Sequence, residues 1–167
     1  MEGFGKIAGV GLASIFGIVV MTSMAGVSLG MPVSDFQFSA DGIQGRGLNL
    51  YAGTISENSG ELGKIFIELD GADIAEMCIS KEMSIGGLTV RAIVKGSSAE
   101  AMSVLMKCEN FMATTMAAEN LGMGPSGDKE FATTADVLNV KNVRAWVSHM
   151  NVGSIDLNDL VIKLEIV

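Results

Sequence analysis

The chain has 167 residues, of which 19 are acidic and 11 are basic, so its formal net charge at pH 7 is −8. This length accommodates one domain of ordinary size beside a short leader. Nucleic-acid binding draws on clustered Lys and Arg, and no two basic residues are adjacent here, so we expect no nucleic-acid partner.

The first predicted element is an apolar leader. From Ile7 to Leu29 no side chain is charged, and an apolar run of about 20 residues is long enough to cross a bilayer as a helix. We therefore predict an N-terminal transmembrane anchor or signal segment over residues 1–30 and an extracytoplasmic β-rich domain over residues 31–167. Because Lys6 precedes the span and Asp35 follows it, the positive-inside tendency places the domain on the extracytoplasmic side of the cell membrane.

The residues leave open whether the leader is cleaved. Ser23-Met24-Ala25 and Ser28-Leu29-Gly30 both fit a small-x-small cleavage site, and cleavage would make the protein a secreted one. The apolar run is longer than the core of a typical signal peptide, which favours a retained anchor.

Small residues recur every four positions in the leader, and such positions share one face of a helix. Small side chains there let two helix backbones approach closely in lipid, so this face predicts a homo-oligomer. The alternative is that Gly and Ala are frequent in membrane helices in any case. The residues of this helix-association face are Gly5, Gly9, Ala13 and Gly17.

From residue 36 onward the apolar residues follow a period of two. The pattern occurs in DFQFSAD, GLNLYAG, KIFIELD and GLTVRAIVKG, and it returns from residue 155 to the C-terminus. Period-two runs bounded by Gly, Asn and Asp are typical of half-buried strands. We predict a single all-β domain (a sandwich, a roll or an irregular solenoid) of about seven to ten strands, preceded by the N-terminal hydrophobic helix.

The stretch 98–119 fits either a helix or a strand. Ser97 to Glu100 resembles a capping box, and Ala, Met, Leu and Glu favour a helix. Against this, apolar and polar residues alternate from Met102 to Cys108 as they do in a strand.

Cys78 and Cys108 are the two cysteines, and neither lies in a CxxC motif, so a zinc or redox role is not expected. In an oxidising compartment they would be able to form a disulfide that closes a loop of about 30 residues. The alternative is that both are unpaired small hydrophobic residues.

The domain predicted over residues 31–167 contains no recognisable catalytic or ligand-binding motif. The one G-x-S-x-G match, Gly26-Val27-Ser28-Leu29-Gly30, falls inside the predicted apolar leader and not at a strand-to-helix turn of a folded domain. The one histidine, His149, directly follows Ser148, so these two side chains cannot adopt the geometry of a triad. The acidic segments ELDGAD and SIDLNDL offer oxygen ligands for calcium, but Asp, Asn and Gly are equally expected at strand turns. We assign no catalytic, cofactor-binding or metal residues, and we do not expect an enzyme.

Several segments also resemble a known family: the opening MEG with its leader, FQFSADGIQGRGLNLYAG, ADIAEMC and ATTADVLNVKNVRAW…GSIDLNDLVIKLEIV. The chain resembles uncharacterised secreted or membrane-anchored proteins that are best known from actinobacteria and often carry the automatic label cholesterol esterase. The resemblance implies an exported β-rich domain of unknown activity and supplies no functional residues.

Together these features predict a non-enzymatic, membrane-anchored structural or assembly protein of the cell envelope or surface, with a polymer as one form of assembly. The alternative function is a binding protein or carrier that takes up a lipid or another hydrophobic ligand. Neither function implies a cofactor.

Overall fold

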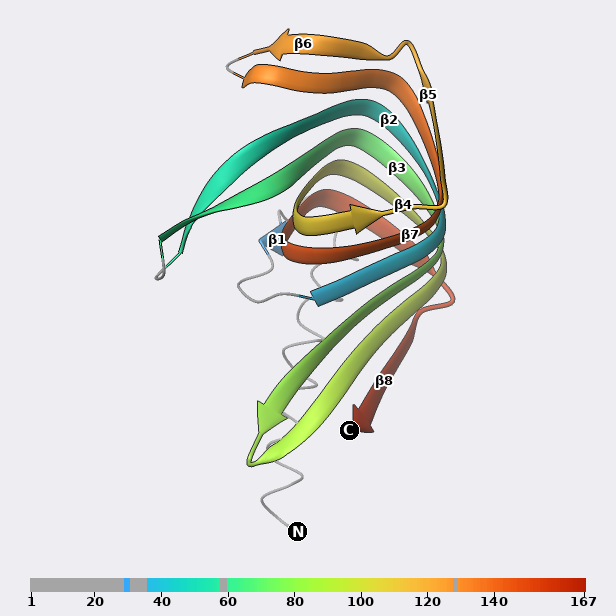
Figure 1. The fold of residues 1–167 in the computed structure, drawn as a ribbon. Coiled ribbons are helices and arrows are strands. Elements are labelled where there is room, and N and C mark those ends of the chain that lie inside the picture. Colours follow the sequence, from blue (N-terminus) through green and yellow to red (C-terminus); the bar gives the residue numbers. More distant parts are fainter. Residues whose placement is uncertain (1–28, 31–35, 58–59, 128) are drawn as a thin grey trace.

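The computed structural model describes residues 29–30, 36–57, 60–127 and 129–167 (Figure 1). The predicted N-terminal helix and its association face at Gly5, Gly9, Ala13 and Gly17 lie outside these residues. Within the described part of the chain, no helix is long and apolar enough to cross a membrane. The described residues form strands without any helix, which confirms the all-β prediction.

The described residues form eight strands in one antiparallel sheet, within the predicted range of seven to ten. The order across the sheet is β1-β7-β2-β3-β4-β8, and β5 and β6 also pair with β7. The strands are β1 (Leu29–Gly30), β2 (Phe36–Glu57), β3 (Gly60–Ile85), β4 (Leu88–Met112), β5 (Thr115–Glu119), β6 (Gly122–Ser126), β7 (Lys129–Asn158) and β8 (Val161–Ile166).

The stretch 98–119, which the sequence left open, belongs to β4 and β5. The helical alternative is therefore wrong. β4 pairs with β3 along one edge and with β7 along the other, so its backbone groups are satisfied by two neighbouring strands. This pairing outweighs the helix propensity of Ala, Met and Leu, which is a weak preference.

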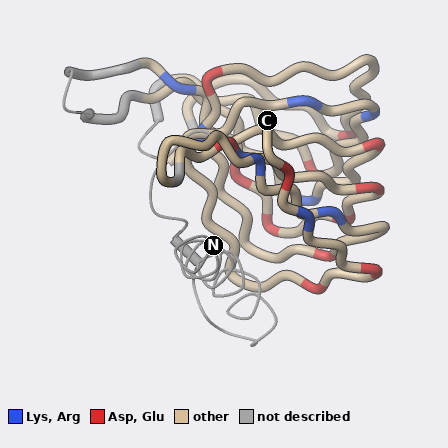
Figure 2. Tube along the Cα trace, turned by 90° about the horizontal axis from the view of Figure 1, so that it is seen from below, with Lys and Arg blue, Asp and Glu red and all other residues tan. Residues whose placement is uncertain are grey.

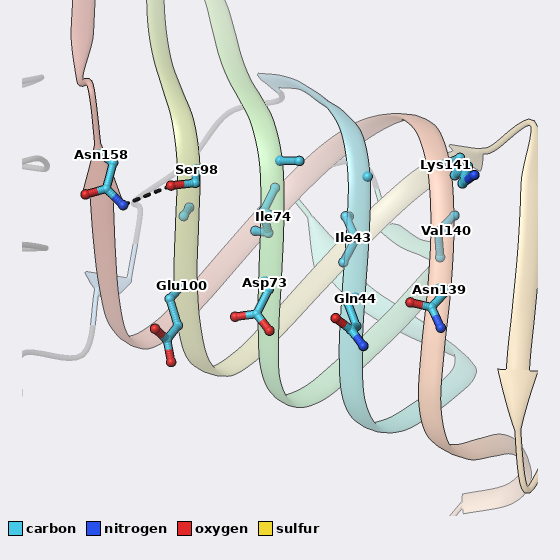
Figure 3. Close-up of a pocket in the computed structure, with 13 residues that line it drawn as sticks. Ile43, Gln44, Asp73, Ile74, Ser98, Glu100, Asn139, Val140, Lys141 and Asn158 are labelled. Atoms are coloured by element: carbon cyan, nitrogen blue, oxygen red, sulfur yellow. Dashed lines mark hydrogen bonds between the residues drawn. The ribbon is translucent and has the colours of Figure 1, made fainter.

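β7 closes the sheet on itself. Its residues 132–147 pair with β2, and its residues 144–158 pair with β4. β2, β3 and β4 are joined by successive antiparallel pairings, so the sheet rolls around a common interior. We call this the rolled sheet, and Figure 3 shows its neighbouring strands side by side on the near face.

The long strands bend together along two lines that cross the sheet (Figure 1). At each line the ladder of paired residues is interrupted. The register of the flanking pairs still places the residues of one line opposite one another on neighbouring strands. The first bend line consists of Thr114, Asn142, Asp41, Glu76, Ser97 and Asp159. The second bend line consists of Asn120, Asp136, Gly47, Asp70, Ser103 and Gly153.

Every second member of each bend line has a left-handed backbone. On the first line φ is 51° at Asn142, Glu76 and Asp159, which alternate with residues of ordinary φ. On the second line φ is 54° at Asn120 and Ser103 and 65° at Gly47. Asn, Asp and Gly adopt this region more readily than other residues, and they occupy four of these six left-handed positions.

Side chains along the bend lines bond to their neighbours. Asn142 Nδ2 donates to Thr114 Oγ1 at 2.9 Å, and Asn120 Nδ2 donates to Asp136 Oδ2 at 2.7 Å. Ser97 Oγ donates to Asp159 Oδ2 at 2.6 Å. Figure 2 shows acidic positions recurring on successive strands along one side of the molecule.

The bends change the spacing of the core residues. In β7 the buried positions 138, 140, 143, 145 and 147 are two apart within a flat segment and three apart across the bend at 142. Two consecutive residues face outward at the bend, and the strand then resumes its alternation. The period of two is therefore correct within each segment and shifts at each bend.

The rolled sheet has two ends. The first bend line passes from Asn142 across β2, β3 and β4 and meets the chain again at Asp159. The second passes from Asp136 across the same strands and meets β7 again at Gly153. Both lines advance by the same number of residues along the chain. The sheet thus winds like a coil. The β5 end is formed by β5 and β6, and the β8 end by β8 and the second half of β7 (Figure 1).

Candidate functional site

A shallow hollow lies on the outside of the rolled sheet between the two bend lines. It has a volume of about 520 Å³ and is lined by residues of β2, β3, β4 and β7 (Figure 3). Gly42 and Ala75 lie opposite each other in its lining, and they leave the space open because glycine has no side chain and alanine has only a methyl group.

A polar row runs along one side of this hollow. The register places Asn139, Gln44, Asp73, Glu100 and Asp156 side by side on neighbouring strands, and Figure 3 shows the first four of these pointing to the same side. Like charges directly opposite one another destabilise a sheet. Arg46 offsets part of this repulsion, because its Nη1 lies 2.7 Å from Asp73 Oδ2.

The acidic segments singled out in the sequence contribute to cross-strand contacts. Glu68 accepts hydrogen bonds from the Tyr51 hydroxyl at 2.6 Å and from Asn49 Nδ2 at 3.3 Å. Asp70 and Asp159 lie on the bend lines. Among the residues that the structure describes, no group of three His, Cys, Asp or Glu side chains is arranged to hold a metal ion.

Ser148 and His149 have separate surroundings. Ser148 Oγ donates to the Lys107 carbonyl at 3.0 Å and so links β7 to β4. Burial lowers the pKa of His149, and the nearby positive charge of Lys107 lowers it further.

Both cysteines are free thiols in the structure. Cys78 is half-buried on β3, opposite Ser39 and Lys95, whereas Cys108 is fully buried on β4, opposite Ile65. Burial raises the pKa of the Cys108 thiol to about 12, although the charge of Lys64 acts in the other direction. The Cys108 thiol is therefore protonated at neutral pH and is a weak nucleophile.

Apolar side chains are exposed at both ends of the rolled sheet. At the β5 end these are Met116 (56%), Leu121 (59%), Met123 (68%) and Phe131 (59%). At the β8 end they are Val161 (43%), Leu164 (37%), Ile166 (65%) and Val167 (60%). Met116 lies opposite Val140, which is only 2% exposed, so Met116 belongs to the same row of core residues. Met116 is nevertheless exposed, because among the described residues no strand pairs with the other edge of β5.

The same ends carry strand edges without a neighbour. Among the described residues, β5 pairs with β7 alone and β8 pairs with β4 alone, so each has one open edge. Such edges present rows of backbone N–H and C=O groups that are ready to pair with another chain. Open edges together with exposed apolar residues make the two ends the candidate functional surface.

Residues 33–167 match the model of a Family of unknown function (DUF6230). The chain belongs to this family. The DUF6230 match spans β2 to β8, that is, the whole rolled sheet except β1. This confirms the sequence-based resemblance to an uncharacterised family. A search of curated proteins found no match, and a search of solved structures found none either.

One feature of this DUF6230 domain that sequence reasoning missed is the buried Lys64. Its side chain is 2% exposed, and Nζ lies 2.8 Å from Glu109 Oε1, which is an outward-facing group at a bulge in β4. The two residues are far apart in sequence. The turn at Gly86-Gly87 is the one available signal, because it fixes the β3–β4 register and so brings Lys64 opposite Glu109.

Proposed function

We propose that this protein is a non-enzymatic structural component that assembles with further copies of itself through the two ends of its rolled sheet. The observation that carries this proposal is the pair of uncovered ends, where core rows run out into exposed apolar side chains beside open strand edges. Contact between copies would remove this apolar surface from water, which is the main driving force for protein association.

The leader supports a location for the assembly. Its uncharged run from Ile7 to Leu29 would hold the domain at the extracytoplasmic side of the cell membrane, and cleavage would release a secreted form. The resemblance to secreted or membrane-anchored proteins of actinobacteria agrees with a role in the cell envelope or surface. Its label of cholesterol esterase finds no support in Ser148, the serine next to the one histidine, because Ser148 directly precedes His149 and its Oγ donates to the Lys107 carbonyl.

The alternative, a carrier for a lipid or another hydrophobic ligand, would require an open apolar interior. The inward rows of the rolled sheet are instead occupied by close-packed side chains such as Phe38, Met77 and Val147, each at most 2% exposed. The hollow in Figure 3 lies on the outside and is lined in part by Gln44, Asp73 and Glu100. These observations favour the assembly proposal over the carrier.

The test compares the size of three full-length proteins in detergent by native mass spectrometry and light scattering. The unchanged chain is expected to form large homomeric assemblies, and Met116→Glu is expected to abolish them, because a charge would then lie in the contact. Met102→Glu is the matched control, since Met102 is also exposed (45%) but lies on β4 within the sheet. It is expected to assemble normally.

A monomeric unchanged chain would overturn the proposal. So would assemblies that survive Met116→Glu, and stoichiometric bound lipid on a monomer would favour the carrier. A separate variant, Gly9→Leu with Gly17→Leu, measures how much the leader contributes, because bulky residues there would separate the helices.

A further inference from the structure

The strand directions allow one copy to continue the sheet of the next. Every neighbouring pair from β5 through β7, β2, β3 and β4 to the second half of β7 is antiparallel. β5 and the second half of β7 therefore run in opposite directions. A second copy in the same orientation, placed beyond the β8 end, would bring its β5 antiparallel to β7 of the first.

One register of the two strands at such a junction joins both bend lines of one copy to those of the next. The first line ends at Thr114 on the β5 end and at Asp159 on the β8 end. The second ends at Asn120 and at Gly153. Thr114 and Asn120 are separated by the same number of residues as Gly153 and Asp159, so antiparallel pairing joins both lines at once.

The alternation of backbone conformation also continues across this junction. Asp159 is left-handed and would meet Thr114, which is not. Gly153 is not left-handed and would meet Asn120, which is. Within the chain every member of both lines alternates with its neighbours in this way, so the junction repeats the rule that forms the bends.

The core rows continue in the same register. One row crosses the sheet from Met116 through Val140 to Leu157, and it would resume at Met116 of the next copy. A parallel row runs from Ala118 through Leu138 to Ile155. The junction would therefore cover the exposed Met116 with an apolar partner.

We propose that copies of this chain stack end to end with β5 of one copy paired antiparallel to Ser154–Asn158 of the next, in the register that places Met116 opposite Leu157. The inference rests on the proposed function and specifies its contact. Two exposed outward residues, Ala117 and Asp156, then lie directly opposite each other, and no two like charges meet among the five pairs. Because each copy offers one end of each kind, the stack can grow without closing.

β1 occupies the neighbouring part of the same edge. Leu29 and Gly30 pair with Val152 and Asn151 of β7, directly beyond the second bend line. The proposed junction uses residues 154–159 and leaves this pairing in place, but an extension past Gly153 would require β1 to move away. The chain's own N-terminal segment is thus the competing occupant of this edge.

Cross-linking tests the register on the full-length protein in a Cys78→Ser background. Two thiols at Ala117→Cys and Asp156→Cys are oxidised by a mild oxidant to one disulfide between copies, because cross-strand partners have Cβ atoms close enough for this bond. Within one chain, four strand segments lie between Ala117 and Asp156 along the sheet. At the usual spacing of neighbouring strands the two positions are roughly 24 Å apart, which prevents a disulfide within one chain. The expected product is a ladder of multimers on a non-reducing gel.

The control pair is Ala117→Cys with Lys163→Cys, which has the same number of exposed thiols on non-opposed segments and is expected to give no ladder. Assemblies of normal size without the ladder, or a ladder of equal strength from the control, would overturn the register while leaving the proposed function intact. Dimers from Ala117→Cys alone would show that two β5 edges meet instead. A monomeric protein would overturn both the stack and the proposed function.

Discussion

The middle of the rolled sheet and its two ends are built from the same rows of residues but differ in how many strands cover them. Val140 in β7 is 2% exposed, whereas Met116, its partner on β5, is 56% exposed. In a sheet closed by β7, each row is covered by further strands until it reaches an end. The exposure of a residue in a core row therefore depends on how close its strand lies to an end of the sheet. Apolar residues exposed at the ends agree with the proposal that another copy covers them.

Truncation of a large apolar side chain should lower the free energy of unfolding far more in the middle of the sheet than at its ends. Phe38→Ala is expected to lower the free energy of unfolding by about 3–5 kcal/mol, because Phe38 is 1% exposed in the middle of the sheet. Phe131→Ala at the β5 end, where Phe131 is 59% exposed, should change it by less than about 0.5 kcal/mol. Urea denaturation of both full-length variants measures the difference, and equal losses would contradict the assignment of middle and end.

The bend lines give the next largest effect. Gly47 has a φ of 65°, and a Cβ there would lie 2.1 Å from Asp70 Oδ2, so Gly47→Ala should cost about 2–4 kcal/mol. Gly63→Ala is the control, since nothing lies within 4 Å of the position that a Cβ would take there. Thermal unfolding of the two variants compares a bend with an open site, and a Gly47→Ala protein as stable as the control would argue against a left-handed bend at this position.

Loss of a partner for the buried lysine should have an intermediate effect. Glu109→Gln removes the carboxylate beside Lys64 and leaves a buried ammonium without its counter-charge, at a cost of about 1–3 kcal/mol. Glu82→Gln breaks an exposed pair with Arg91 and should cost at most about 1 kcal/mol. Denaturant titrations rank the two variants. If the order is reversed, Lys64 is not held by Glu109 as the structure shows.

The smallest expected effect is the loss of stability between pH 8 and pH 10. The pKa of Cys108 is about 12 in the folded protein against an ordinary value of 9.0, so the folded state holds its proton more tightly. The resulting stability is complete below pH 9 and is lost as the pH rises toward 12, by up to about 1.4 kcal/mol per pH unit. Unfolding measured at pH 8 and pH 10 should show a smaller decline for Cys108→Ala than for the unchanged chain. An identical decline would mean that Cys108 is not the titrating group.

The all-β class follows from the sequence because each flat segment alternates over several residues, as Phe36, Phe38 and Ala40 do. The bends do not follow from it. The alternation shifts after Ala40 because Asp41 lies opposite the left-handed Glu76 on β3, and this pairing depends on the register of two distant strands. Local composition gives no sign that Glu76 adopts this conformation.

The candidate surface was likewise only partly predictable. The period-two pattern predicts strands, and open strand edges can pair with another chain, but the sequence does not show which strands lie at the ends. Met106 and Met116 both lie in the stretch 98–119, which the sequence left open between helix and strand, yet Met106 is 3% exposed and Met116 is 56% exposed. The difference in exposure arises because Met106 lies on β4, between β3 and β7, whereas Met116 lies on β5, which pairs with β7 alone among the described residues.

Amide hydrogen exchange tests the central claim most directly, because it reports on the middle and the ends in one experiment. We compare the assembled unchanged chain with the Met116→Glu variant. Exchange in residues 115–119 and 154–158 should be slower in the assembly, while residues 65–75 of β3 should be equally protected in both. Assemblies whose two ends exchange as fast as those of the variant, with new protection elsewhere, would contradict the account.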